Sequence, residues 1–307
     1  MNKKFKILTL LGSPNDAKSN TRAFVEDFVD EVVAGGLEAI HQVIPLGRKN
    51  ISLCKGCWNC TKGKRCPLYN DDIEEIKSKM IDCDMLILAT PVYTNQVSAQ
   101  MKALFDRLFT WCHIFPLLGK YGLSVCTTGN DGFREMGDFQ EKILGTYGVS
   151  SFGTIYSAGA FTPGFFPRRE MARKRYKLFA KRVANVILSG KKPPITNWQN
   201  RMFKVMKKKM NGVHVIHYLR YGAVNNQPDP SRFLLWMMKK IMKKRKVTDE
   251  QIDKLANVMT FELNWWQDRN WLYARNFKQL LETPIPDGFD AKQHLLQPEP
   301  NRYKTVA

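Results

Sequence analysis

The sequence is short of acidic residues, and the shortage falls in one half of the chain. Its 307 residues include 48 Lys and Arg but only 28 Asp and Glu. Residues 1–165 are nearly balanced, with 18 basic and 17 acidic residues, whereas residues 166–307 hold 30 basic and 11 acidic residues. The change falls at the turn-forming segment TPGFFP, residues 162–167. We therefore expect a first domain over residues 1–165 and a basic extension over residues 166–307.

Signatures of several other function classes are missing. No apolar run approaches the roughly 18 residues that a membrane-spanning helix needs. The sequence shows no Ser-His-Asp arrangement or carboxylate pair that would indicate a hydrolase, no internal repeat and no low-complexity tract. At the N-terminus, the apolar run 7–11 is too short for the core of a signal peptide and reads as a buried strand. We expect a cytoplasmic protein whose seven cysteines stay reduced.

Strand and helix patterns alternate through the first part of the chain. Apolar or β-rich runs predict five strands, at 6–11, 38–45, 85–90, 123–128 and 152–156. Amphipathic patterns predict helices at 21–33, 71–81, 97–111 and 133–147, and a long basic helix at 168–188. This alternation predicts an α/β fold with helices on both faces of a five-stranded parallel sheet. Because such sheets bind ligands at the carboxyl ends of their strands, the loops after strands one, three and four are the expected site.

These three loops carry side chains suited to a phosphate and a planar ring. The first, residues 12–21, places hydroxyl and amide groups just before a helix, whose exposed N–H groups and dipole suit a phosphate, although a plain helix cap uses the same residues. It matches neither the dinucleotide-fold nor the Walker glycine pattern. The second, residues 90–95 (TPVYTN), supplies apolar and aromatic walls, and the third, residues 127–132 (TTGNDG), is a small loop able to close over a ring. Together they indicate one ligand site.

The same segments resemble a known family. GSP…SNT in the first loop, TPVYTNQVSAQMKALFDR and TTGNDG are similar to the NADPH-dependent FMN reductase and iron–sulfur flavoprotein branch of the flavodoxin-like superfamily. The resemblance covers about residues 5–160 and implies a flavodoxin-like fold, bound FMN, NAD(P)H as co-substrate and a homodimer or higher oligomer. By position, it assigns the FMN phosphate to Ser13, Ser19, Asn20 and Thr21. It assigns the isoalloxazine ring to Pro91, Val92, Tyr93, Thr94, Asn95, Thr128, Gly129 and Asn130.

Four cysteines lie within 13 residues: Cys54, Cys57, Cys60 and Cys66. Four closely spaced thiolates are the ligands of a 4Fe-4S cluster, and the spacing resembles the cluster motif of iron–sulfur flavoproteins. A zinc site is less natural, because four-cysteine zinc sites usually consist of two separated pairs. A redox-active thiol pair and a run that holds no metal remain alternatives. Cys83, Cys112 and Cys126 are expected to be small core residues.

The basic extension reads as helices at 198–210, 231–246 and 248–272, followed by an extended tail after Thr283. The first two helices carry Met and Leu at helical spacing beside lysines. Such helices could pack on the first domain, lie on an anionic membrane surface, or form a lid or subunit interface. Nucleic acid is an unlikely partner, because no base-reading motif accompanies the lysines.

The functional expectation is an FMN-dependent oxidoreductase. It would transfer electrons from NAD(P)H or a redox protein to a quinone, an aromatic compound or another protein, by way of FMN and a 4Fe-4S cluster. His113 is a weak candidate for a proton donor, since a lone histidine is more often structural. The alternatives are a non-enzymatic flavodoxin-like electron carrier and a membrane-surface interaction protein. We expect the protein in the cytoplasm or peripheral to the inner face of the membrane, with an anionic membrane surface as a candidate partner.

Overall fold

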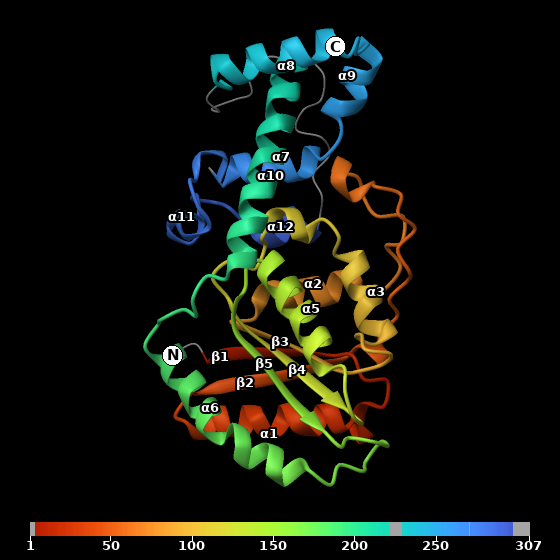
Figure 1. Cartoon of the computed structure of the whole chain (residues 1–307), viewed down its shortest axis with the longest axis vertical. Helices are drawn as coiled ribbons and strands as arrows, with labels where there is room; N and C mark the ends of the chain where they lie inside the picture. Colours follow the sequence, from red (N-terminus) through yellow and green to blue (C-terminus); the bar gives the residue numbers. More distant parts are fainter. Residues whose placement is uncertain (1–3, 222–228, 270, 297–307) are drawn as a thin grey trace. The chain divides into compact units, whose positions relative to one another are not determined.

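The computed structural model of the chain describes residues 4–221, 229–269 and 271–296 (Figure 1). The backbone forms two compact units. The first comprises Met1–Lys55 and Leu68–Trp198, and the second comprises Gly56–Pro67 and Gln199–Ala307. Most of the cysteine run is therefore grouped with the C-terminal helices rather than with the sheet.

The first unit is built on a five-stranded parallel sheet. Its strands are β1 Phe5–Leu11, β2 Ala39–Pro45, β3 Met85–Pro91, β4 Tyr121–Thr128 and β5 Ser150–Ala158. They are ordered β2-β1-β3-β4-β5, which is the flavodoxin-like order of a doubly wound fold. Strands β3 and β4 are buried along almost their whole length, which explains why their sequences are continuous apolar runs. The predicted fold class and its five strands are confirmed.

Helices cover both faces of this sheet (Figure 1). On one face lie α1 (Asn20–Ala34) and α6 (Arg169–Leu188), which pack their apolar side chains against β1, β3 and β4. The other face is covered by α2 (Ile73–Asp82), α3 (Ala99–Arg107) and α5 (Phe133–Thr146). The helix expected over 97–111 ends at Arg107, and a separate short helix, α4, runs from Trp111 to Ile114.

Part of the basic surplus is neutralised within this unit by acidic residues of α1. Arg169 forms a bidentate ion pair with Asp27, with both N–O distances at 2.7 Å. One turn further along, the Arg173 Nε donates to Glu31 Oε1 at 2.9 Å. These ion pairs join α6 to α1, and because both arginines are about half exposed their contribution to stability is small.

The second unit consists of helices. They are α7 (Asn197–Tyr221), α8 (Arg232–Lys244), α9 (Asp249–Ala256), α10 (Thr260–Asp268), α11 (Phe277–Glu282) and α12 (Ala291–Leu296). The single helix expected over 248–272 is wrong: Met259 adopts a left-handed φ of 58° between α9 and α10, and an α-helix cannot continue through that conformation. The tail expected after Thr283 contains α12, and its last residues, 297–307, lie outside the described part. No described helix is both long and apolar enough to span a membrane.

The stability of the first unit should depend on the protonation of Glu141 on α5. Burial raises the pKa of this carboxyl from 4.5 to about 7, although a hydrogen bond from Ser151 Oγ at 2.9 Å opposes the shift. The folded state holds this proton more tightly than the unfolded state does, so the protonated carboxyl of Glu141 contributes to stability. That contribution is complete below the unfolded-state pKa and is lost as the pH rises to about 7. Glu141→Gln should therefore gain stability relative to the parent protein between about pH 5 and about pH 7.5, measured by urea unfolding.

The control for this prediction is Glu135→Gln, because Glu135 is an exposed residue on the same helix. The pH-dependent gain in stability of Glu141→Gln should exceed any change with pH that this variant shows. A pH-independent difference for Glu141→Gln would contradict the prediction.

Candidate functional site

The first two loops meet closely at the carboxyl ends of β1 and β3. The Gly12 N–H donates to the Ala89 carbonyl oxygen at 2.7 Å. A Cβ atom at Gly12 would lie only 2.8 Å from both Ser98 Oγ and Thr90 Oγ1, so the approach requires glycine. Ser98 caps α3 by accepting the Met101 N–H. The N-terminus of α3 is therefore held directly against the first loop.

The residues assigned to the phosphate occupy two kinds of position. Ser13 and Ser19 are buried in the first loop, and Ser19 Oγ caps α1 by accepting the Arg22 N–H at 3.1 Å. The amide of Asn20 donates to the carbonyl oxygens of Thr162 and Phe165, at 2.8 and 3.0 Å. Thr21 is buried, with its Oγ1 2.6 Å from Thr127 Oγ1. Asn20 and Thr21 thus anchor the start of α1 to the segments after β5 and in β4.

The loops after β3 and β4 pack against each other. The Val92 N–H donates to the Thr127 carbonyl oxygen at 2.8 Å. Gly132 has a φ of 81°, and a Cβ atom there would lie 2.5 Å from Asn95 Oδ1 and 2.9 Å from Val92 Cγ1. Thr94 and Asn95 also have positive φ, in a tight turn closed by reciprocal hydrogen bonds between Tyr93 and Gln96 at 2.9 Å. The turn leaves the Tyr93 side chain exposed.

The third loop is held in shape by Thr128. Its Oγ1 donates to the Asp131 carbonyl oxygen at 2.6 Å and accepts the Asn130 N–H at 3.2 Å. Such a turn, tied to a buried side chain, keeps its backbone N–H and carbonyl groups in defined directions. The residues assigned to the ring thus lie in two adjoining loops whose conformations are fixed by hydrogen bonds.

A fourth loop, residues 159–167 after β5, was missed as part of the site. Gly159 and Ala160 donate to the carbonyl oxygens of Gly129 and Thr128, at 3.3 and 3.1 Å, and Gly164 donates to that of Lys18 at 2.8 Å. The Phe161 ring lies next to Gly129 and is largely exposed, as is Phe165. The sequence pattern of this segment predicts only a domain boundary. Two phenylalanines directly after a strand at the ligand-binding edge were the signal available.

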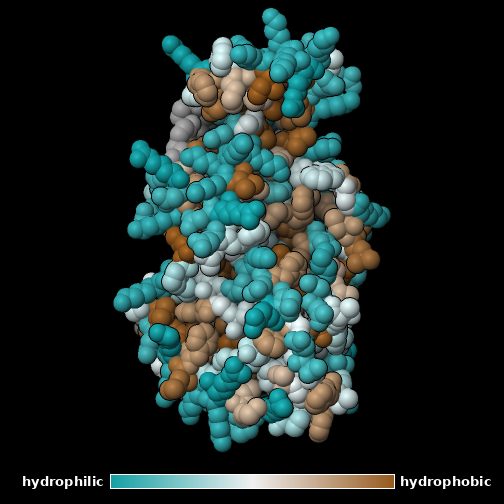
Figure 2. Space-filling model, viewed as in Figure 1, coloured by the Kyte–Doolittle hydropathy of each residue, from teal (hydrophilic) through white to brown (hydrophobic). Residues whose placement is uncertain are grey.

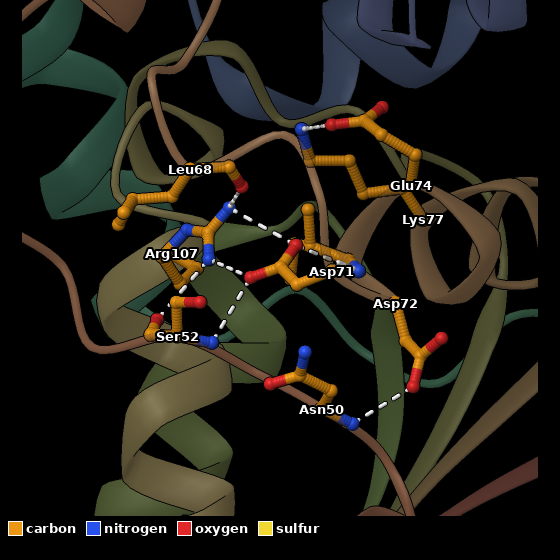
Figure 3. A network of polar contacts seen from close by, with 9 residues as sticks. Asn50, Ser52, Leu68, Asp71, Asp72, Glu74, Lys77 and Arg107 are labelled. Carbon is orange, nitrogen blue, oxygen red and sulfur yellow. Dashed lines mark hydrogen bonds and ion pairs between the residues drawn. The ribbon is translucent and has the colours of Figure 1, made fainter.

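The cysteine run is held at both ends by one buried ion pair (Figure 3). Arg107 on α3 donates to the carbonyl oxygens of Ser52 and Leu68, at 3.1 and 2.7 Å. It also pairs with the carboxylate of Asp71, whose Oδ2 accepts the Ser52 N–H at 2.9 Å. The side chains of Arg107 and Asp71 are 2% and 0% exposed. We refer to these four residues as the Arg107–Asp71 clamp.

The clamp requires an ionised Asp71. Burial opposes ionisation, but hydrogen bonds from Arg107 and from the Ser52 backbone outweigh it, so the pKa of Asp71 lies below its ordinary value. The contribution of ionised Asp71 to stability is therefore present at neutral pH and is lost as the pH falls through the folded-state pKa of this carboxyl.

The four thiols of the run lie on or near the surface. Cys54 and Cys57 are exposed, and Cys60 and Cys66 are half-buried. Within the second unit, the short 3-10 helix η3 (Cys60–Lys62) packs against α10. Four thiols are chemically suited to an iron–sulfur cluster. Across the described residues, however, no three Cys, His, Asp or Glu side chains lie close enough to hold one metal ion. Their assignment as ligands stays a prediction.

The remaining candidate side chains lie in the packed interior. Burial raises the pKa of Cys83 and of Cys126 to about 12, which confirms their expected role as core residues, whereas Cys112 is half-buried. His113 is buried, with its ring 5.1 Å from that of Phe109 in an edge-on arrangement. A role for His113 in proton donation stays a prediction.

Residues 5–160 match the family described as NADPH-dependent FMN reductase. This chain belongs to that family. It is therefore a flavodoxin-like flavoprotein of the oxidoreductase class. The four loops fit FMN, because a capped helix N-terminus suits its phosphate and adjoining loops with apolar walls suit its ring.

Several curated relatives are iron–sulfur flavoproteins. One from Archaeoglobus fulgidus is 31% identical over 160 residues, which is 52% of this chain and 70% of that protein. Another, from Methanocaldococcus jannaschii, is 37% identical over 120 residues, which is 39% of this chain and 60% of that protein. A third, from Clostridioides difficile, is 24% identical over 194 residues, covering 62% of this chain and 83% of that protein.

Solved structures show more distant similarity. RosB with a bound flavin-derived intermediate, 8-demethyl-8-formylriboflavin-5'-phosphate, has a TM-score of 0.48 and 17% identity, over 66% of this chain and 87% of that chain. An NAD(P)H:quinone oxidoreductase from Methanothermobacter marburgensis has a TM-score of 0.44 and 17% identity, over 59% of this chain and all of that chain.

Proposed function

We propose that this protein takes electrons from NAD(P)H or a reduced redox protein and passes them to a quinone-like, aromatic or protein acceptor. The observation that carries the proposal is the meeting of four loops at the carboxyl edge of the sheet, in a member of an FMN reductase family. FMN supplies the chemistry when it is bound, since it accepts a hydride and releases electrons singly or in pairs.

Each loop has a role in this proposal. The N-terminus of α1, with Ser13 and Ser19, binds the phosphate, while Asn20 and Thr21 hold that helix in place. The ring is bound by the loops after β3 and β4, through Pro91, Val92, Tyr93, Thr94, Asn95, Thr128, Gly129 and Asn130. The exposed rings of Tyr93 and Phe161 border the site and favour a flat, apolar acceptor over a small polar one.

We also propose that Cys54, Cys57, Cys60 and Cys66 hold a 4Fe-4S cluster, which supplies one-electron transfer when it is bound. Support comes from the four thiols, from the clamp that holds the ends of the run, and from the relatives that are iron–sulfur flavoproteins. The protein is proposed to be cytoplasmic and to function as a homodimer or higher oligomer, which light scattering would test.

The test is the visible spectrum of anaerobically purified protein, with iron and acid-labile sulfide measured on the same sample. Flavin bands, about four irons per chain and steady NAD(P)H oxidation with a quinone are expected. Flavin and iron without quinone reduction by either NAD(P)H or a reduced redox protein would instead indicate a non-enzymatic electron carrier. Flavin without iron would contradict the cluster, and a colourless protein that cannot be reconstituted with FMN would contradict the whole proposal.

Gly132→Ala should weaken FMN binding by about tenfold or more. The new Cβ atom would push Val92 and Asn95, two residues of the loop after β3, out of their positions. Fluorescence titration of the apoprotein with FMN measures this affinity. Gly153→Ala is a matched control: its φ is also positive, at 98°, but a Cβ atom there would meet nothing within 4 Å. Equal losses in both variants would indicate general backbone strain and contradict the specific contact.

A further inference from the structure

Helices α7 and α8 have similar basic, methionine-rich sequences but differ in burial. In α7 the apolar stripe is covered, with Phe203, Met206, Met210 and Val213 all buried. In α8 no side chain is buried: its two leucines and three methionines are half-covered, and the other side chains of the helix are exposed. The second unit therefore uses the apolar stripe of α7 for its core and leaves much of α8 exposed.

The outward face of α8 combines aromatic and basic side chains. Phe233 and Trp236 are 65% and 57% exposed, with ring centroids 6.2 Å apart. Helical spacing places Lys240 and Lys243 on the same side of the helix, and the Lys240 Nζ lies 5.0 Å from the centroid of the Trp236 ring. Two large rings and several ammonium groups therefore share one exposed surface.

Helix α8 itself carries no acidic side chain. Between Asp229 and Asp249 the sequence contains no acidic residue but seven basic ones: Arg232, Lys239, Lys240, Lys243, Lys244, Arg245 and Lys246. Within the described part of the chain, none of the seven forms an ion pair with a carboxylate. In Figure 2, apolar and hydrophilic side chains are interspersed at the top of the view, where α8 lies.

We propose that the α8 surface, defined by Phe233, Trp236 and the seven basic residues, docks on an anionic lipid membrane. Clustered Lys and Arg side chains are attracted to acidic headgroups. Aromatic rings partition into the headgroup region, and the alkyl stems of lysine let the ammonium groups stay in water while the helix lies flat. The positive charge alone would attract a nucleic-acid duplex as well as a membrane, but the exposed ring pair favours the headgroup region of lipid over the phosphate surface of a duplex. This proposal does not depend on the flavin chemistry.

The test is cosedimentation of the full-length protein with vesicles, either phosphatidylcholine alone or phosphatidylcholine mixed with phosphatidylglycerol. We expect binding only to the mixed vesicles, and less of it at high salt. Replacing Lys239, Lys240, Lys243 and Lys244 with Glu should weaken binding about a hundredfold. Phe233→Ala with Trp236→Ala should weaken it about tenfold without any change of charge.

A matched control is available on α7. Replacing the exposed Arg201, Lys204, Lys208 and Lys209 with Glu makes the same change of charge in the same unit, and binding should stay within about threefold of the parent value. Equal losses in this variant and the α8 charge variant would overturn the proposal in favour of unspecific attraction. Unchanged binding by both α8 variants would also overturn it. The proposal would also be overturned if the protein bound RNA or duplex DNA but not the vesicles, and if replacing the α8 lysines abolished that nucleic-acid binding.

The flavin provides an internal check on these variants. All of them should keep the parent's circular dichroism, FMN content and NAD(P)H oxidation, because neither α7 nor α8 carries any of the proposed flavin-binding residues. Loss of vesicle binding with an intact flavin spectrum supports the docking surface. A flavin-free protein that still binds anionic vesicles would contradict only the proposed function.

Discussion

Asp71→Asn should lower the free energy of unfolding by about 3–5 kcal/mol, because it leaves the buried guanidinium of Arg107 without its counter-charge. Urea unfolding at neutral pH measures the change. The same variant should make the 54–66 segment easier to cleave by limited proteolysis, since the clamp holds the chain at Ser52 and Leu68 on either side of it.

The control is an ion pair on α3, the helix that carries Arg107. Lys102 and Asp106 form an exposed ion pair at 2.6 Å, with both side chains about half exposed, so Asp106→Asn should cost no more than about 1 kcal/mol. If Asp71→Asn cost as little, the clamp would have no structural role. Lowering the pH should narrow the gap between the parent and Asp71→Asn, because protonation of Asp71 removes the same charge from the parent.

Cys57→Ser should reduce iron from about four atoms per chain to less than one while FMN content stays at the parent value. A cubane needs four soft thiolate ligands, and a serine hydroxyl is a poor substitute. The measurement is iron and acid-labile sulfide per chain in anaerobically purified protein, with FMN released and quantified from the same sample.

Cys112→Ser is the matched control, because Cys112 is half-buried outside the run and its thiol donates to the Phe109 carbonyl oxygen at 2.8 Å, as a hydroxyl can. It should keep both iron and FMN. Full iron in Cys57→Ser would exclude Cys57 as a ligand. Loss of FMN together with iron would show that the variant disturbs the flavin loops rather than a separate centre.

The sheet could be predicted from the sequence because its signals are local. The strands buried on both faces, such as 85–90, appear as continuous apolar runs, and a parallel sheet places the loops after β1, β3 and β4 at one edge. The break at Met259 could not be predicted, because a left-handed residue inside an amphipathic pattern leaves no mark on its periodicity.

The parts of the site that could not be predicted from the sequence depend on long-range contacts. The 159–167 loop is placed by hydrogen bonds to Lys18, Thr128 and Gly129, which lie far away in the sequence. The clamp joins Arg107 to Asp71 across 36 positions. Pairings of this kind depend on how the helices dock on the sheet, which no local pattern encodes.

The sequence alone determined the class of protein: its hydrophobic periodicity specifies a parallel α/β sheet, and the residue types at three strand ends suit a phosphate and a flat ring. It also put the four thiols within one stretch of 13 residues, because their spacing is a property of the chain. Only the tertiary structure distinguished α7 from α8, whose sequences carry the same stripe of methionines and lysines. The difference is one of burial: a periodic pattern shows that a helix has an apolar face, but which face is covered depends on the elements that pack against it.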